Sequence, residues 1–161
     1  MAIRVTPLRR RADREWAARL MAASEPWLTL GRGRDDALRL LKDRAKECYL
    51  VRCGGERAGF LVLDLNGPLG GYLQTIGIAP EMRGCGVGTA ALRWAERHVF
   101  ASQENLLLCV SSFNRRAAAL YRRLGYGTVV RLRDYVVAGH DEILMRKTRG
   151  PLSARKPRKP A

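Results

Sequence analysis

Residues 76–89 read IGIAPEMRGCGVGT and carry the most informative pattern of this 161-residue chain. An apolar stretch typical of a strand stops at Pro80, and a glycine-rich turn then leads directly into a segment with helical spacing. Glycines at positions 84, 86 and 88 let the backbone approach a ligand closely, and the N–H groups at a helix N-terminus attract anions. We therefore expect an anion site here that is suited to a pyrophosphate.

Two common phosphate-binding motifs do not fit this turn. A dinucleotide fingerprint that starts at Gly84 needs a glycine at position 89, which is Thr89, and the Gly-Lys-Ser/Thr of a P-loop is absent. A loop shaped only for packing is the alternative interpretation. The strongly amphipathic helix that follows, predicted over 86–100, favours the ligand site; its apolar stripe is Val87, Ala91, Trp94, Ala95 and Val99.

The same kinds of pattern divide the rest of the chain into seven strands and four helices. The run NLLLCVS at 105–111 is apolar at nearly every position, as expected for a strand covered on both faces. The order of elements predicts a mixed sheet with helices on both faces. Strands are expected at 3–7, 48–53, 57–65, 71–79, 105–111, 126–137 and 141–147, and helices at 12–23, 36–47, 86–100 and 115–124.

Composition limits the class of protein. The length suits one domain, and 47% hydrophobic residues exclude a fully disordered chain. No apolar run is long enough for a membrane span and the N-terminus lacks a signal-peptide pattern, so we expect a cytoplasmic protein with no membrane contact. Four cysteines without a CxxC pair, and only two histidines, predict reduced thiols and no metal site.

The net charge of +15 is the unusual number. The last fifteen residues, KTRGPLSARKPRKPA, contain six basic residues and no acidic residue. We expect a single domain over residues 1–147 followed by a basic, disordered tail over 148–161. A weak contact of this tail with RNA or the ribosome is one interpretation, and a solvated end is the other.

Two motifs resemble those of a known family. Arg83-x-x-Gly86-x-Gly88 is similar to the Arg/Gln-x-x-Gly-x-Gly/Ala signature of the GNAT N-acetyltransferases, which bind acetyl-coenzyme A. Asn114-x-x-Ala117, followed by a Leu-Tyr-x-x-x-Gly-Tyr segment at 120–126, resembles their second motif at the expected distance. The resemblance covers roughly residues 47–147. It implies an α/β fold with a mixed, mostly antiparallel sheet of about seven strands flanked by about four helices, and direct transfer of an acetyl group from acetyl-CoA to an amine.

The resemblance also implies roles for individual residues. The amides of residues 84–89 would hold the pyrophosphate, and the backbone of Ile76 and Ile78 would bind the pantetheine arm and polarise the acetyl carbonyl. Tyr121 would be the catalytic acid for the departing thiolate, since a phenol of pKa ~10 can donate to a thiolate whose conjugate acid lies near ~8.5. A packed aromatic is the alternative for Tyr121. The full predicted coenzyme-binding set is Ile76, Ile78, Ala79, Arg83, Gly84, Cys85, Gly86, Val87, Gly88, Thr89, Asn114 and Tyr121.

Within the family, the chain most resembles the protein N-terminal acetyltransferases, including the ribosomal-protein kind. By that resemblance, Tyr72, Gln74 and Tyr135 would bind the substrate at the peptide entrance. Half-buried strand aromatics are the alternative for both tyrosines. Trp16, Trp27 and Tyr49 either line the acceptor site or pack in the core.

The general base is not assigned by this resemblance. Cys109 stands where these enzymes commonly have Glu or His, and we expect it to be a small core residue because a neutral thiol is a poor base. His140 and Glu81 fit an exposed turn and a loop-shaping role better than proton abstraction. Without a strong base, an α-amine of pKa ~7.7–8.0 is the favoured acceptor, because a lysine of pKa ~10.4 is almost fully protonated at neutral pH.

Two alternatives remain for the function. For the oligomeric state, both a monomer and a homodimer are compatible with the sequence. The first is acetylation of a small-molecule amine such as a polyamine, an amino acid or an antibiotic. The second is a degenerate acyl-CoA-binding module that docks on RNA or the ribosome.

Overall fold

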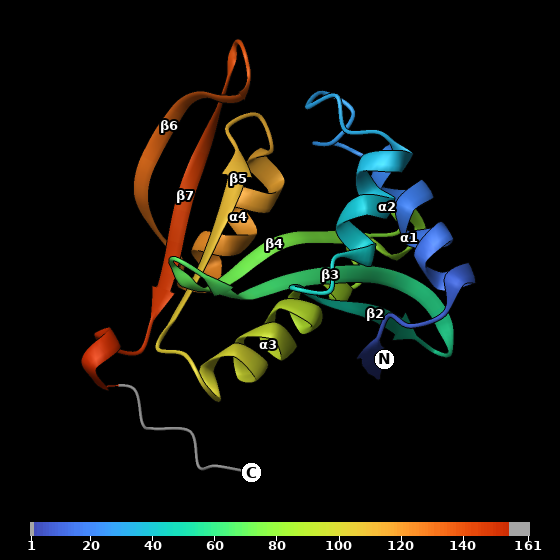
Figure 1. The fold of residues 1–161 in the computed structure, drawn as a ribbon, viewed down its shortest axis with the longest axis horizontal. Helices are drawn as coiled ribbons and strands as arrows, with labels where there is room; N and C mark the ends of the chain where they lie inside the picture. The colour runs from blue at the N-terminus through green and yellow to red at the C-terminus, as the bar shows by residue number, and fades with distance from the viewer. Residues whose placement is uncertain (1, 155–161) are drawn as a thin grey trace.

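The computed structural model describes residues 2–154, and its seven strands form one sheet in the order β1-β2-β3-β4-β5-β7-β6 (Figure 1). Strands β4 and β5 pair in parallel, whereas every other neighbouring pair in the described part of the chain is antiparallel. The mostly antiparallel mixed sheet expected from the sequence is confirmed. The strands are β1 (Ile3–Pro7), β2 (Glu47–Cys53), β3 (Glu56–Gly67), β4 (Gly70–Ile78), β5 (Asn105–Ser111), β6 (Gly127–Val137) and β7 (His140–Thr148).

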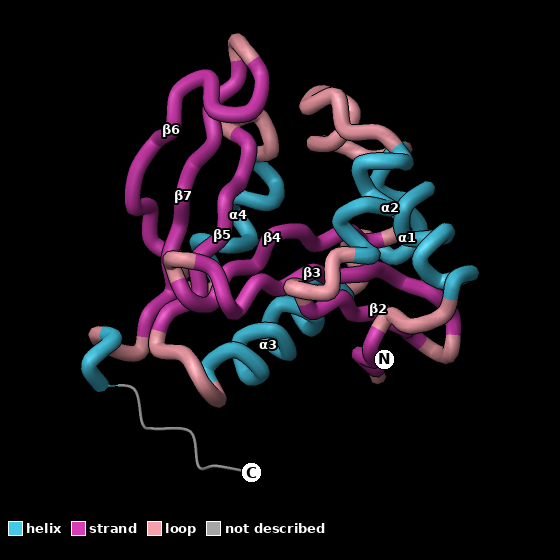
Figure 2. The backbone as a smooth tube through the Cα atoms, in the orientation of Figure 1, coloured by secondary structure: helices cyan, strands magenta, loops and turns pink. Residues whose placement is uncertain are grey.

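Four α-helices cover the sheet from both sides. Helices α1 (Arg11–Ala22) and α2 (Arg34–Lys42) lie on one face of β2–β4, and α3 (Val87–Phe100) lies on the other (Figure 2). Helix α4 (Arg115–Arg123) packs beside β5 and shares its buried core with α3. The apolar side chains of α1 and α2 form a second core around Phe60 on the opposite face of the sheet.

The sheet opens where β4 and β5 separate. Their pairing is confined to Gly71–Leu73 opposite Leu106–Leu108. Beyond this contact β4 continues along β3 to Ile78, while β5 continues along β7 to Ser111. Figure 1 shows the two strands running apart from this point. The separation leaves one edge of each strand without a strand partner and creates a wedge in the middle of the molecule.

The predicted boundaries lie within two residues of those in the structure, except at the end of α2. The helix expected over 36–47 ends at Lys42, because Asp43 is extended and its side chain accepts a hydrogen bond from the amide of Ala45 at 2.9 Å, which forms a turn instead. Strand β3, expected over 57–65, continues to Gly67, which pairs with Gly70 at the start of β4.

The C-terminal segment is described only in part. Strand β7 reaches Thr148, whose hydroxyl donates to the carbonyl of Gly150 at 3.0 Å, and a short 3₁₀ helix follows at Leu152–Ala154. The remainder of the predicted tail, residues 155–161, lies outside the described residues. Within residues 2–154 no helix is both long and apolar enough to cross a lipid bilayer.

Candidate active site

A cleft of about 1250 Å³ occupies the wedge between β4 and β5. Its walls come from β4, the following glycine-rich turn, α4, the β5–β7 pair and the connection between α1 and α2. The structure therefore brings together residues that lie far apart in the sequence. The predicted site residues that line it are Tyr72, Gln74, Ile76, Ile78, Arg83, Gly84, Gly86, Gly88, Thr89, Asn114, Tyr121 and Tyr135.

Three predicted coenzyme-binding residues do not line the cleft with their side chains. Ala79 is buried, and its amide donates to the carbonyl of Ala58 on β3 at 2.9 Å. Val87 is buried in the core, and the thiol of Cys85 is exposed and contacts the carbonyl of Arg83. Of these three, Cys85 and Val87 remain candidates through their backbone amides alone.

The glycine-rich turn forms a cradle of free amides at the start of α3. Within residues 2–154, the N–H groups of residues 84–89 donate no hydrogen bond. Gly84 and Gly86 both have φ of +81°, a conformation that side-chain-bearing residues rarely adopt. Together with the positive end of the helix dipole, these amides can bind an anion such as a pyrophosphate.

Gly88 has a different reason to be glycine. It lies inside α3, and a Cβ at this position would meet only Ile78 Cγ1 at 3.6 Å and Leu120 Cδ2 at 3.9 Å, which are ordinary contacts. Neither the backbone nor the protein packing therefore excludes a side chain at position 88. The position is best explained by a ligand that approaches the helix closely, which disfavours a loop shaped only for packing.

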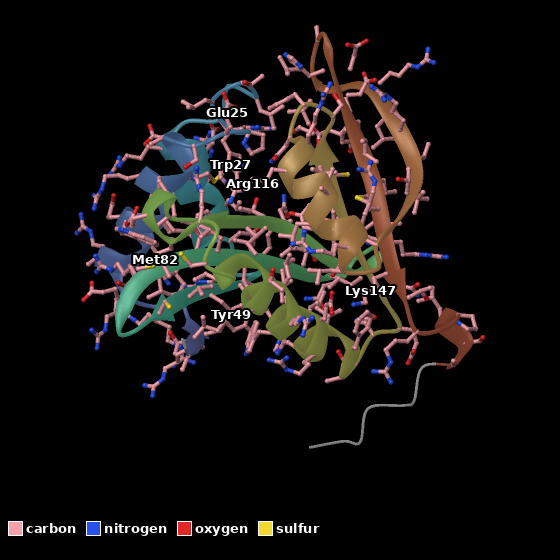
Figure 3. All side chains as sticks on the ribbon, turned by 180° about the vertical axis from the view of Figure 1, so that it is seen from behind. Glu25, Trp27, Tyr49, Met82, Arg116 and Lys147 are labelled. Atoms are coloured by element: carbon pink, nitrogen blue, oxygen red, sulfur yellow. The ribbon has the colours of Figure 1, made fainter. Side chains whose placement is uncertain are left out.

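A cation that was not predicted from the sequence lies beside the cradle. The guanidinium of Arg116, on the first turn of α4, lies 3.7 Å from the position that a Cβ on Gly84 would take, and Arg116 lines the cleft. Figure 3 shows Arg116 facing the gap, with Glu25 and Trp27 on the side of the N-terminal helices. Arg116 could not be assigned from the sequence because α4 carries several arginines and only the packing shows which one faces the turn.

The open edge of β4 presents backbone groups to the cleft. Successive amides of a strand point alternately to its two sides. Because the amide of Ala79 points to β3, those of Ile78 and Ile76 point away from β3 toward the wedge. A carbonyl or amide ligand lying along this edge can therefore pair with them as an additional strand would.

Helix α4 places two predicted residues in the cleft wall. Asn114 is the N-cap, as predicted, and its side chain accepts a hydrogen bond from the amide of Ala117 at 3.3 Å. Tyr121 is only 7% exposed and its ring packs edge-on against Tyr126, with ring centroids 5.9 Å apart. Burial raises the pKa of Tyr121 to about 12, so its hydroxyl stays protonated at neutral pH and can donate a proton.

Cys109 is not the core residue that the sequence suggested. It is half-buried, lies on the cleft wall and faces the hydroxyl of Tyr72. The pKa of the Cys109 thiol is raised by burial, and the neighbouring Tyr72 lowers it only in part. Burial also raises the pKa of Tyr72. Neither group is ionised at neutral pH, so neither is a ready proton acceptor.

A buried carboxylate on the same wall was missed by the sequence analysis. Glu142 lies at the start of β7, is 5% exposed and lines the cleft. Its Oε1 accepts a hydrogen bond from Ser111 Oγ at 2.6 Å. Burial raises the pKa of Glu142, and the hydrogen bond from Ser111 opposes this in part. The direction in which Glu142 points depends on the β5–β7 register, which no local pattern reveals.

The aromatic candidates divide between the two faces of the sheet. Trp27 lines the cleft and packs on Phe60, with ring centroids 6.2 Å apart. Tyr49 lies on the opposite face, beside Trp94 and His98, and takes no part in the cleft. Trp16 packs against the core under α1 and α2.

Tyr135 lines the mouth of the cleft on an irregular part of β6. The β6–β7 register shifts between Leu132 and Val137, so the intervening residues bulge and leave Tyr135 65% exposed. The two other base candidates lie outside the cleft lining: His140 packs against Phe113, and Glu81 is exposed in a 3₁₀ turn. In the described part of the chain, no three His, Cys, Asp or Glu side chains gather as a metal site.

The fold, the amide cradle and the wedge define a coenzyme-dependent acyltransferase, and comparison with known proteins identifies the family. The model described as "Acetyltransferase (GNAT) family" matches residues 9–126, so the chain belongs to the GNAT acetyltransferases. It is an N-acetyltransferase that takes its acetyl group from acetyl-CoA.

Three similar proteins show the range within the family. The N-alpha-acetyltransferase RimI of Mycobacterium tuberculosis is 31% identical over 140 residues, which cover 84% of each chain. The spermidine N(1)-acetyltransferase of Escherichia coli is 32% identical over 89 residues, covering 53% of this chain and 48% of that protein. The crystal structure of the ribosomal-protein-S18-alanine N-acetyltransferase of E. coli superimposes with a TM-score of 0.74 at 20% identity, over 91% of this chain and 94% of that one.

Proposed function

We propose that the acceptor of this N-acetyltransferase is the α-amine at the N-terminus of a protein or peptide. The main support for this proposal is the small number of unpaired carboxylates in the cleft. Four acidic residues line it, and Asp36 and Asp64 are paired with Arg39 and Lys46. A polyamine carries several ammonium groups and needs several unpaired carboxylates, whereas an α-amine needs only one.

The two remaining carboxylates differ in their surroundings. Glu25 accepts hydrogen bonds from the amide and hydroxyl of Thr29, the latter at 3.0 Å, and lies in the exposed α1–α2 connection. Glu142 is buried on the wall formed by β5 and β7. The cleft therefore offers one enclosed negative charge, which matches a single ammonium group.

The mouth of the cleft suits a peptide. Tyr72 lies on β4 and Tyr135 on the β6 bulge, and both line the cleft near Cys109 and Glu142. Aromatic rings at such a mouth, here the half-buried Tyr72 and the exposed Tyr135, can bind the backbone of an extended peptide without requiring one side chain. Similarity to RimI over 84% of both chains supports the same acceptor, since the spermidine acetyltransferase matches only about half of this chain.

Mass spectrometry of acetylated peptides tests this proposal. Matched peptides with one internal lysine, one series with a free and one with a blocked N-terminus, are incubated with labelled acetyl-CoA, with spermidine in parallel. We expect label on the free N-terminus and little on lysine or spermidine. Faster labelling of the blocked peptide or of spermidine would show that the acceptor has been assigned wrongly.

The cytoplasmic location, the contact of the basic tail with RNA or the ribosome, and the choice between monomer and homodimer stay predictions from the sequence. An N-terminal acceptor is compatible with each of them.

A further inference from the structure

The β5–β7 register places a carboxylate beside the position at which the usual base is missing. Ser111 lies opposite Glu142, and Cys109 lies opposite Leu144. Since residues two apart on a strand share a face, the side chains at 109, 111 and 142 belong to one face of the sheet. That face is the wall of the cleft beyond the last β4–β5 pair, Leu73 opposite Leu108.

Glu142 has no cationic partner in the described part of the chain. Among residues 2–154, its one hydrogen bond to a side chain comes from Ser111, and no Lys, Arg or His nitrogen of this range lies within 4.0 Å of it. A buried carboxylate without a cation costs folding free energy, so its presence at the cleft calls for a function. In contrast, the adjacent Asp141 is paired with Arg131.

The titratable groups around Glu142 leave it as the proton acceptor. Tyr72 from β4 and Cys109 from β5 lie near it, and Tyr135 from β6 lies near Tyr72. Burial keeps the first two protonated at neutral pH. His140, two residues away on β7, packs against Phe113 and does not line the cleft.

We propose that Glu142 is the general base of the acetyl transfer and performs the role for which Cys109 is unsuited. Its carboxylate removes a proton from the acceptor ammonium, and the neutral amine then attacks the acetyl carbonyl carbon. A C–N bond forms, and the C–S bond to coenzyme A breaks. The acceptor nitrogen loses two protons in total. Glu142 passes one of them to solvent. Tyr121 donates a proton to the departing thiolate and is replenished by the other.

Burial makes Glu142 a better base than an exposed glutamate. Its pKa is raised by desolvation, so its conjugate acid is weaker and proton transfer from an ammonium group is less unfavourable. The hydrogen bond from Ser111 holds one oxygen, Oε1, and leaves Oε2 for the acceptor. A base at this position acts in the transfer step itself, so Glu142 would serve a peptide N-terminus and spermidine alike.

Kinetics of two variants test the inference, using whichever of the peptide and spermidine the wild-type enzyme acetylates. Glu142→Gln keeps an oxygen for Ser111 but cannot take a proton, and we expect kcat to fall about 10²–10⁴-fold. The dissociation constant for acetyl-CoA, measured by calorimetry, should not change. Glu56→Gln, on an exposed residue of β3, is the matched control and should retain its kcat.

The pH profile of Ser111→Ala is a measurement that would not change if Glu142 had only a structural role. Because the hydrogen bond from Ser111 lowers the pKa of Glu142, its loss should raise that pKa further. The acid limb of the kcat–pH profile should then move to higher pH. An aminooxy-terminated peptide, which is neutral at pH 7, should recover much of the rate that Glu142→Gln loses.

Three results would overturn the assignment. One is a kcat of Glu142→Gln within about twofold of wild type, since general base catalysis is worth more than this. Another is a raised acceptor KM with an unchanged kcat, which would make Glu142 a binding residue. The third, which remains decisive if Glu142→Gln fails to fold, is an unshifted acid limb in Ser111→Ala. An enzyme that prefers spermidine would contradict the proposed acceptor but not this role.

Discussion

The guanidinium of Arg83 donates a hydrogen bond from Nε to the carbonyl of Ile78 at 2.9 Å, across the turn that joins β4 to the amide cradle. Its Nη2 reaches the buried hydroxyl of Ser24 at 3.3 Å. One side chain thus connects the end of β4, the cradle and the α1–α2 connection. We therefore expect the protein itself to hold the cradle in place, which would lower the entropy cost of binding the coenzyme.

Replacing Arg83 should therefore weaken coenzyme binding although its hydrogen bonds go to protein. Arg83→Ala removes both bonds, and we expect the dissociation constant for acetyl-CoA to rise about tenfold, the equivalent of one hydrogen bond to a charged group. Calorimetry measures this. The lysine of Arg83→Lys can reach only one of the two acceptors, so its dissociation constant should lie between those of wild type and Arg83→Ala. An unchanged dissociation constant in Arg83→Ala would contradict the tethering role.

Two glycines of the cradle should respond to alanine in opposite directions. Gly88→Ala places a good helix former inside α3 without a clash, so the free energy of unfolding should rise by up to about 1 kcal/mol. Gly86→Ala forces a side chain into a positive-φ conformation and should cost about 1–2 kcal/mol. Both should weaken acetyl-CoA binding. Thermal unfolding without ligand measures the change in stability, and calorimetry measures the change in affinity for acetyl-CoA. If Gly88→Ala binds acetyl-CoA with normal affinity, packing and not a ligand explains the glycine at position 88.

Tyr121→Phe tests the catalytic acid. The change keeps the ring that packs against Tyr126 and removes only the hydroxyl, so kcat should fall about 10²-fold while acetyl-CoA affinity is retained. Because the pKa of Tyr121 is raised to about 12, the wild-type enzyme should lose no activity through its ionisation between pH 7 and about pH 10. A variant with wild-type kcat would identify Tyr121 as a packed aromatic.

Glu142 should reduce stability while it serves the reaction. A carboxyl whose folded-state pKa is raised destabilises the fold fully above that pKa, and the penalty shrinks as pH falls below it and is gone below the unfolded-state pKa. Glu142→Gln should therefore have a higher free energy of unfolding than wild type at neutral pH, with the difference shrinking in acid. Urea denaturation of both proteins at neutral and at acid pH measures this difference in the free energy of unfolding. A less stable variant at neutral pH would mean that the Ser111 contact needs the charge.

Local signals were sufficient for most of the fold and for the elements that surround the glycine-rich turn. Pro80 and the glycines at 84 and 86 marked the passage from β4 to α3, and Asn114 marked the start of α4. The prediction that a helix continued to residue 47 was wrong because apolar spacing through Ala45 outweighed the capping preference of Asp43. Helical periodicity alone does not reveal where a turn competes successfully.

The acceptor side depended on contacts between distant segments. Glu142 meets Ser111 only through strand register, and Arg116 meets the cradle only through the packing of α4 on α3. Cys109 was expected in the core because its strand is apolar throughout, but the separation of β4 and β5 exposes one of its faces to the cleft. A pattern within one strand cannot show where a neighbouring strand leaves it.

The short parallel contact between Gly71–Leu73 and Leu106–Leu108 has a consequence for divergence within the family. In the proposed site, the donor would be held by groups on and next to β4 and α3, mainly backbone, and the acceptor would meet side chains on β5, β6 and β7 together with Tyr72 of β4. Because the strand pairing that joins the two parts of the sheet is so short, we expect substitutions of exposed side chains on one part to disturb the other part little. An ancestral enzyme could thus exchange one amine for another by altering a few exposed side chains of β6 and β7, while its nucleotide-binding half was inherited unchanged.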